Sequence, residues 1–87
     1  MFLEIITPDK TIFQGEVETA TFPGVDGFFQ LLNNHAPMIS ALGKGDIRYK
    51  LEKKKEVHFL VDGGVVEVVN NQVNVLVEKV LSEQSSE

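Results

Sequence analysis

The chain has 87 residues, of which 43% are hydrophobic, and it carries a net charge of −5. A chain of this length forms one domain with a single thin core, and this hydrophobic fraction is typical of a packed protein and not of a disordered one. The acidic balance argues against nucleic acid and anionic lipid as partners, and the absence of cysteine excludes disulfides, thiolate zinc sites and cysteine nucleophiles.

Apolar and polar residues alternate along most of the chain. In residues 45–51, for example, Ile47, Tyr49 and Leu51 alternate with charged residues. A period of two is typical of half-buried β-strands. The strands that the pattern predicts are, in chain order, residues 3–7, 11–14, 17–22, 28–32, 38–42, 45–51, 57–62, 65–69 and 72–78.

Short turn signals separate the predicted strands. Many short strands joined by tight turns predict an all-β fold, either a sandwich or a small barrel. For the pair Gly63-Gly64, a bulge or a close approach between strands is also expected. The polar residues 80–87 predict a tail of frayed helix or coil. The turn signals are Pro8-Asp9, Pro23-Gly24, Asp26-Gly27, Asn33-Asn34, Gly43-Lys44-Gly45, Gly63-Gly64 and Asn70-Asn71.

No group of residues has the spacing of a catalytic or metal site. The two histidines, His35 and His58, are too few for a metal site, which needs three or four converging ligands. We expect His35 to be buried or hydrogen-bonded and His58 to face the surface. Gly63-Gly64 lacks the lysine and the following helix of a phosphate loop. The sequence therefore predicts a protein that is not an enzyme, holds no cofactor or metal, takes no small-molecule substrate and works by binding other proteins.

Several short motifs follow one another in a specific order. Between residues 3 and 81 this order resembles the N-terminal β-sandwich domain of the epsilon subunit of F-type ATP synthase. The resemblance implies a two-sheet β-sandwich of about ten short strands over residues 1–81, followed by a polar C-terminal tail, residues 82–87. The motifs are residues 13–17 (FQGEV), 22–27 (FPGVDG), 35–37 (HAP), Leu42 with Gly45, residues 62–68 (DGGVVEV) and 71–76 (NQVNVL).

The resemblance also implies a function. The epsilon subunit belongs to the central stalk, or rotor, of the proton-translocating ATP synthase. It binds the gamma subunit and the membrane-embedded c-ring and helps to couple proton flow to ATP synthesis, without hydrolysing nucleotide itself. This places the chain on the cytoplasmic side of the bacterial plasma (inner) membrane as a peripheral part of F1. Contact with the membrane would then occur only through the complex.

Two sets of contact residues are carried over from the family. Phe29 is expected to point inward by alternation, which leaves Phe28 either exposed as an apolar anchor or folded back on the sandwich edge. The family usually has other residues at Phe28, Gln30 and Asn33-Asn34, and most members continue into two C-terminal helices. The c-ring set is Phe28, Gln30, Leu31, Leu32, Asn33 and Asn34, and the gamma set is Thr7, His35 and Ser40.

Two other classes of β-sandwich remain as alternatives. A lipoyl or biotinyl carrier domain has a similar size and would present Lys54, between Glu52 and Glu56, as the modified residue. A sandwich that binds a peptide or sugar would need an aromatic face, yet aromatic residues make up only 8% of the chain. Most of them are expected in the core, namely Phe13, Phe22, Phe29 and Phe59.

Overall fold

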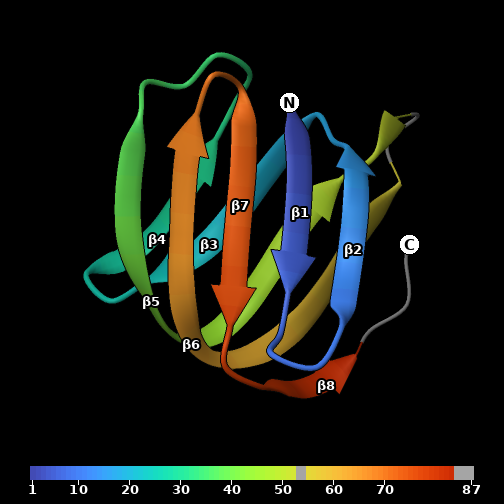
Figure 1. Cartoon of the computed structure of the whole chain (residues 1–87), viewed down its shortest axis with the longest axis vertical. Helices are drawn as coiled ribbons and strands as arrows, with labels where there is room; N and C mark the ends of the chain where they lie inside the picture. Colours follow the sequence, from blue (N-terminus) through green and yellow to red (C-terminus); the bar gives the residue numbers. More distant parts are fainter. Residues whose placement is uncertain (53–54, 84–87) are drawn as a thin grey trace.

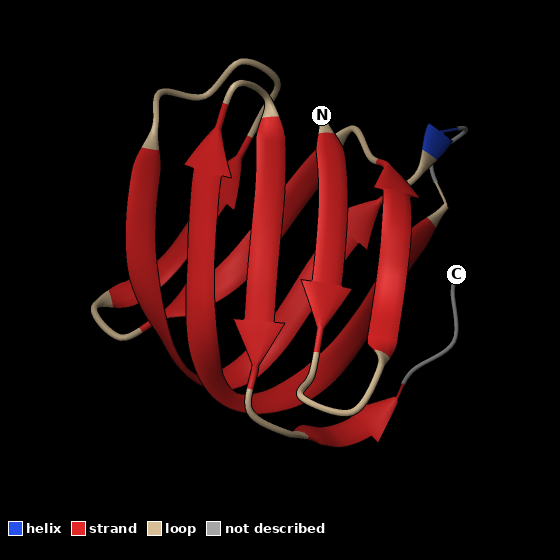
Figure 2. Ribbon diagram, viewed as in Figure 1, coloured by secondary structure: helices blue, strands red, loops and turns tan. Residues whose placement is uncertain are grey.

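The computed structural model describes residues 1–52 and 55–83, and most of them lie in β-strands (Figures 1 and 2). No helix in these ranges is long and apolar enough to cross a membrane. The eight strands of the described chain are β1 (Phe2–Ile6), β2 (Thr11–Glu16), β3 (Thr19–Gly24), β4 (Gly27–Leu31), β5 (Met38–Lys50), β6 (Glu56–Val69), β7 (Gln72–Val77) and β8 (Val80–Glu83).

The strands form two facing layers, and the two long strands β5 and β6 bend and run through both (Figure 1). The first layer contains β2, β1, β7, the C-terminal half of β6 and the N-terminal half of β5. The second layer contains β4, β3 and the other halves of β5 and β6, with β8 paired to β6. The predicted all-β sandwich is confirmed. The described residues form eight strands and not about ten because β5 and β6 each join two segments that the sequence pattern separates.

Glycine allows β6 to bend without breaking its pairing. Gly63 has a φ of 100°, and a side chain on Gly64 would collide with the carbonyl oxygen of Leu76 on β7. The expected close approach at this pair is therefore confirmed. The prediction of turns between strands at Gly63-Gly64 and at residues 43–45 is wrong. β5 and β6 stay paired in one register from Met38↔Val68 to Lys50↔Glu56.

The core lies between the layers and is built mainly from the inward-facing side chains of β1 and of β3 to β7, against which the partly buried side chains of β2 pack. Phe22 and Phe59 are buried as expected, whereas Phe13 and Phe29 are partly buried at its margin. The largest fully buried side chains are Phe22, Leu3, Ile5, Leu31, Ile47, Val61, Val66, Val73, Val75 and Val77.

The predicted tail begins as a strand. The expectation of helix or coil is wrong for residues 80–83, because β8 pairs with the first half of β6 at Phe59, Leu60 and Val61. Without β8, this part of β6 would be an unpaired edge of the second layer, and Val80 packs against the core. Residues 84–87 of the predicted tail, and Lys53 and Lys54 of the lysine run, lie outside the described residues.

Candidate partner-binding surfaces

The predicted c-ring residues on β4 divide between the two faces of the strand. Phe28 and Gln30 are exposed, whereas Phe29 packs inward with its ring centroid 5.7 Å from that of Phe22. Phe28 is 64% exposed, and its ring leans over Gly45, where an added Cβ would lie 3.7 Å from the ring. Leu31 is completely buried, so its place among the contact residues is wrong: alternation puts it on the core side of the strand.

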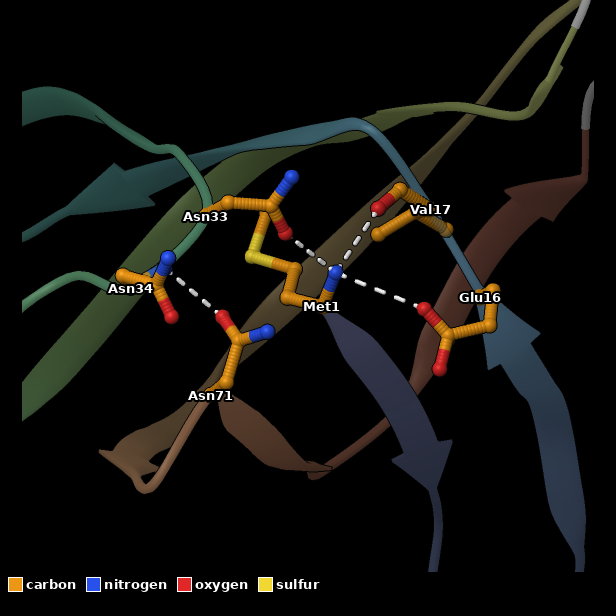
Figure 3. Close-up of polar contacts among 6 residues, drawn as sticks. All are labelled: Met1, Glu16, Val17, Asn33, Asn34 and Asn71. Atoms are coloured by element: carbon orange, nitrogen blue, oxygen red, sulfur yellow. Dashed lines mark hydrogen bonds and ion pairs between the residues drawn. The ribbon is translucent and has the colours of Figure 1, made fainter.

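The rest of the predicted c-ring set lies in residues 32–37, the β4–β5 loop, and polar contacts hold it (Figure 3). The amino group of Met1 donates hydrogen bonds to Oδ1 of Asn33 (2.5 Å) and to the carbonyl of Val17 (3.2 Å). The backbone N–H of Asn34 donates to Oδ1 of Asn71 (2.7 Å), which belongs to the β6–β7 turn. These contacts tie an exposed loop to two neighbouring segments of the same end of the sandwich.

The asparagines at this end take the backbone conformation that the turn pattern predicts. Asn34, Asn70 and Asn71 have φ values of 64°, 52° and 61°. Asparagine tolerates this left-handed region better than most residues. Asn33-Asn34 and Asn70-Asn71 therefore make tight turns without glycine.

The predicted gamma residues do not form one cluster. Thr7 lies in the β1–β2 turn, where its Oγ1 accepts hydrogen bonds from the backbone N–H groups of Asp9 and Lys10 (3.2 Å each). His35 is exposed in the β4–β5 loop, with Nδ1 2.8 Å from the carbonyl oxygen of Ala36. The turn and the loop lie at opposite ends of the first layer (Figure 1), and Ser40 is half-buried on β5.

The second histidine departs from its expected place. His58 is half-buried on β6, and its Nδ1 atom is buried without a hydrogen-bond partner among residues 1–52 and 55–83. Its neighbour across the strands is Arg48. Within the same ranges, no three His, Asp or Glu side chains gather to hold a metal ion.

Sequence reasoning missed an apolar surface on the outside of the first layer. Its exposed side chains are Ile6, Ile39, Val65 and Leu76, which are 36%, 72%, 41% and 48% exposed, and we call this surface the apolar outer face. Ile6 pairs with Leu76, and Leu76 pairs with Val65, so three of the four form a row across β1, β7 and β6. The signal was present in runs such as Val75-Leu76-Val77, because a strand that is covered on one face only must expose one of two consecutive apolar residues.

The comparison with known families identifies the fold and the family together. Residues 1–83 match the family described as the β-sandwich domain of the ATP synthase delta/epsilon chain. The chain belongs to this family. The resemblance inferred from the order of motifs is therefore confirmed.

Relatives of two lengths match the chain. The ATP synthase epsilon chain of Chlorobium limicola is 44% identical over 78 residues, covering 90% of this chain and 89% of that protein. The epsilon chain of Chlorobaculum tepidum is 41% identical with the same coverage. The epsilon chain of Maridesulfovibrio salexigens is also 41% identical, but only 54% of its length is matched. Thus some relatives are about as long as this chain, whereas in others little more than half of the length is matched.

Solved structures share the sandwich at low sequence identity. A chain of the Euglena gracilis mitochondrial ATP synthase, solved as an assembly of OSCP, F1 and c-ring, superposes with a TM-score of 0.85 at 21% identity over 92% of this chain and 51% of its own length. A chain from the Tetrahymena thermophila mitochondrial ATP synthase central stalk and c-ring superposes with a TM-score of 0.81 at 19% identity. The match covers 94% of this chain and 66% of that chain. These two likenesses concern the fold.

Proposed function

We propose that the chain is an epsilon-type subunit of the central stalk of an F-type ATP synthase. In this role it couples proton flow to ATP synthesis by holding other subunits together and performs no chemistry of its own. The observation that carries the proposal is the 44% identity to an epsilon chain that it matches over about nine-tenths of both proteins. The subunit would be peripheral on the cytoplasmic side of a bacterial inner membrane, which it contacts through the complex.

Two separate surfaces support binding to two partners. The c-ring surface consists of Phe28 and Gln30 on β4 with Leu32, Asn33 and Asn34 of the β4–β5 loop, all of which are exposed. Phe28 and Leu32 offer the apolar area that anchors interfaces. The buried Leu31 is not part of it.

The gamma surface is the apolar outer face. Thr7 directly follows Ile6, so one of the expected gamma residues lies at the margin of this face. Ser40 pairs with the buried Val66 on β6, so it points to the opposite side of β5 from this face. His35 lies beyond it, in the β4–β5 loop. Exposed apolar side chains grouped on one sheet face are typical of a protein-binding surface.

A sandwich suits the transmission of torque because its strands cannot slide independently. β5 and β6 pass through both layers and stay paired along their whole length. A force applied to the outer face of the first layer therefore reaches β3 and β4 through continuous strands. Rigid elements that carry a contact surface hold it better than loops do.

The direct test is reconstitution. An F-type ATP synthase from which the epsilon subunit has been removed, preferably from a close relative of the source of this chain, is embedded in vesicles and supplied with the purified chain. We expect the chain to co-purify with the gamma subunit and c-ring and to restore proton-driven ATP synthesis. Failure to join the complex at saturating concentration would refute the proposed function.

A further inference from the structure

Among the residues that the structure describes, the apolar outer face carries two carboxylates and no Lys or Arg. Glu4 on β1 pairs with Asn74 on β7, which pairs with Glu67 on β6. This polar row lies beside the row of Ile6, Leu76 and Val65, and the two rows line one shallow hollow together with Ile39. In the described part of the chain neither carboxylate has an ion-pair partner.

The excess of negative charge extends over the whole layer. The segments that build it, residues 2–6, 11–16, 38–42, 64–69 and 72–77, contain no Lys or Arg. Covering Glu4 and Glu67 with an uncharged apolar surface would bury carboxylates without compensation, which is costly. A partner that covers this face must therefore bring its own cations.

We propose that this face binds an amphipathic α-helix of the gamma subunit that carries two basic residues, Lys or Arg, two turns apart beside an apolar stripe. This inference rests on the proposed function and adds the chemistry of the partner. Glu4 and Glu67 lie two strands apart, about 10 Å. Positions i and i+7 of a helix are separated by about 10.5 Å along its axis. A helix lying across the strands places its cations over the polar row and its apolar stripe over Ile6, Leu76 and Val65.

The same charges disfavour two other occupants. A second copy of this chain, related by a two-fold axis, would bring Glu4 and Glu67 against the same acidic face of its partner. Each copy also carries a net charge of −5. An anionic lipid surface would repel the face in the same way.

The test measures the dissociation constant between the purified chain and the gamma subunit at low and high salt. We expect Glu4→Gln with Glu67→Gln to weaken binding about tenfold and to reduce its salt dependence, because partly desolvated charge pairs across an interface contribute both affinity and steering. The double substitution Glu18→Gln with Glu52→Gln changes the net charge equally at exposed sites away from the face and should leave binding unchanged. Ile39→Ser with Leu76→Ser should also weaken binding at least tenfold.

The outcomes separate the two proposals. If the unmodified chain does not bind the gamma subunit at all, the proposed function fails. If the chain binds but Glu4→Gln with Glu67→Gln binds as tightly and with the same salt dependence, only the present inference is overturned. It is also overturned if sedimentation shows a dimer of the chain that Leu76→Ser dissociates, because a second copy would then occupy the face.

Discussion

The apolar outer face and the β4–β5 loop both carry exposed side chains, but different contacts hold them in place. The apolar outer face lies on four strands whose backbones are paired in continuous register. The loop depends on a few polar contacts, chiefly those of Asn33 with Met1 and of Asn34 with Asn71 (Figure 3). Substitutions on the outer face should therefore change binding without changing the shape of the face, whereas substitutions of the residues that hold the loop, such as Asn71, should change the shape of the loop.

Large losses of stability are expected at two places, and the first is where one strand approaches another most closely. Gly64→Ala pushes a methyl group into the backbone of β7 at Leu76, so β6 must shift, and unfolding should become easier by about 3 kcal/mol or more. Gly43→Ala is the matched control, because a Cβ there meets nothing closer than 3.9 Å. Urea titration of both variants measures the difference. Equal stability would mean that the bend of β6 does not need glycine at this position.

The two faces of β4 give the next contrast. Leu31→Asp places a carboxylate in the core, and we expect a loss of about 4 kcal/mol or more, comparable with the whole stability of a domain of this size. Phe28→Asp, three residues earlier on the exposed face, should cost within about 0.5 kcal/mol. Thermal melting distinguishes them, and a folded Leu31→Asp variant beside an unfolded Phe28→Asp variant would reverse the assignment of the faces.

A smaller effect tests the loop. Asn71→Gly keeps a residue that tolerates positive φ but removes the acceptor for the N–H of Asn34, so we expect a loss of about 1 kcal/mol. Hydrogen exchange at the Asn34 amide should become faster in this variant. Asn70→Gly lies in the same turn and keeps the side chain of Asn71, so the protection of Asn34 should persist. Unchanged exchange in Asn71→Gly would show that this contact does not hold the loop.

The smallest expected change in stability appears only at alkaline pH. Burial raises the pKa of Tyr49 above its usual value of 10.0, and its ring packs 4.3 Å from that of Phe13. Because the pKa is higher in the folded protein, the neutral phenol contributes fully to the stability of the fold below pH 10. This contribution is lost as the pH rises through the folded pKa. Stability measured from pH 8 to 11 should fall less steeply in Tyr49→Phe. An equal slope would assign the alkaline loss to other groups.

Much of the fold follows from alternation, and the failures have local causes. The pattern located the strands and the buried faces, including the inward Phe29. It divided β5 and β6 because Gly43 and Gly63-Gly64 have the composition of turns, whereas backbone pairing with neighbouring strands carries the chain straight through them. It missed β8 because four residues hold too little periodicity, and the need to cover the edge of β6 arises only in three dimensions.

The candidate surfaces were predicted less completely. Alternation alone would have removed Leu31 from the c-ring set, since Leu31 shares a face with Phe29. The row of Ile6, Leu76 and Val65 could not be assembled from the sequence, because it depends on the parallel pairing of β1 with β7. The contact of Asn34 with Asn71 joins residues 37 positions apart in the chain and was equally hidden.

The account makes one central claim, that opposite sides of a single rigid sandwich hold two different subunits. The chain has no cysteine, so single substitutions give unambiguous crosslinks in the reconstituted ATP synthase. We expect Ile39→Cys, on the apolar outer face, to crosslink to the gamma subunit, and Phe28→Cys, on β4, to crosslink to subunit c. Crosslinking of both positions to the same subunit, or of neither position in an active complex, would contradict the account.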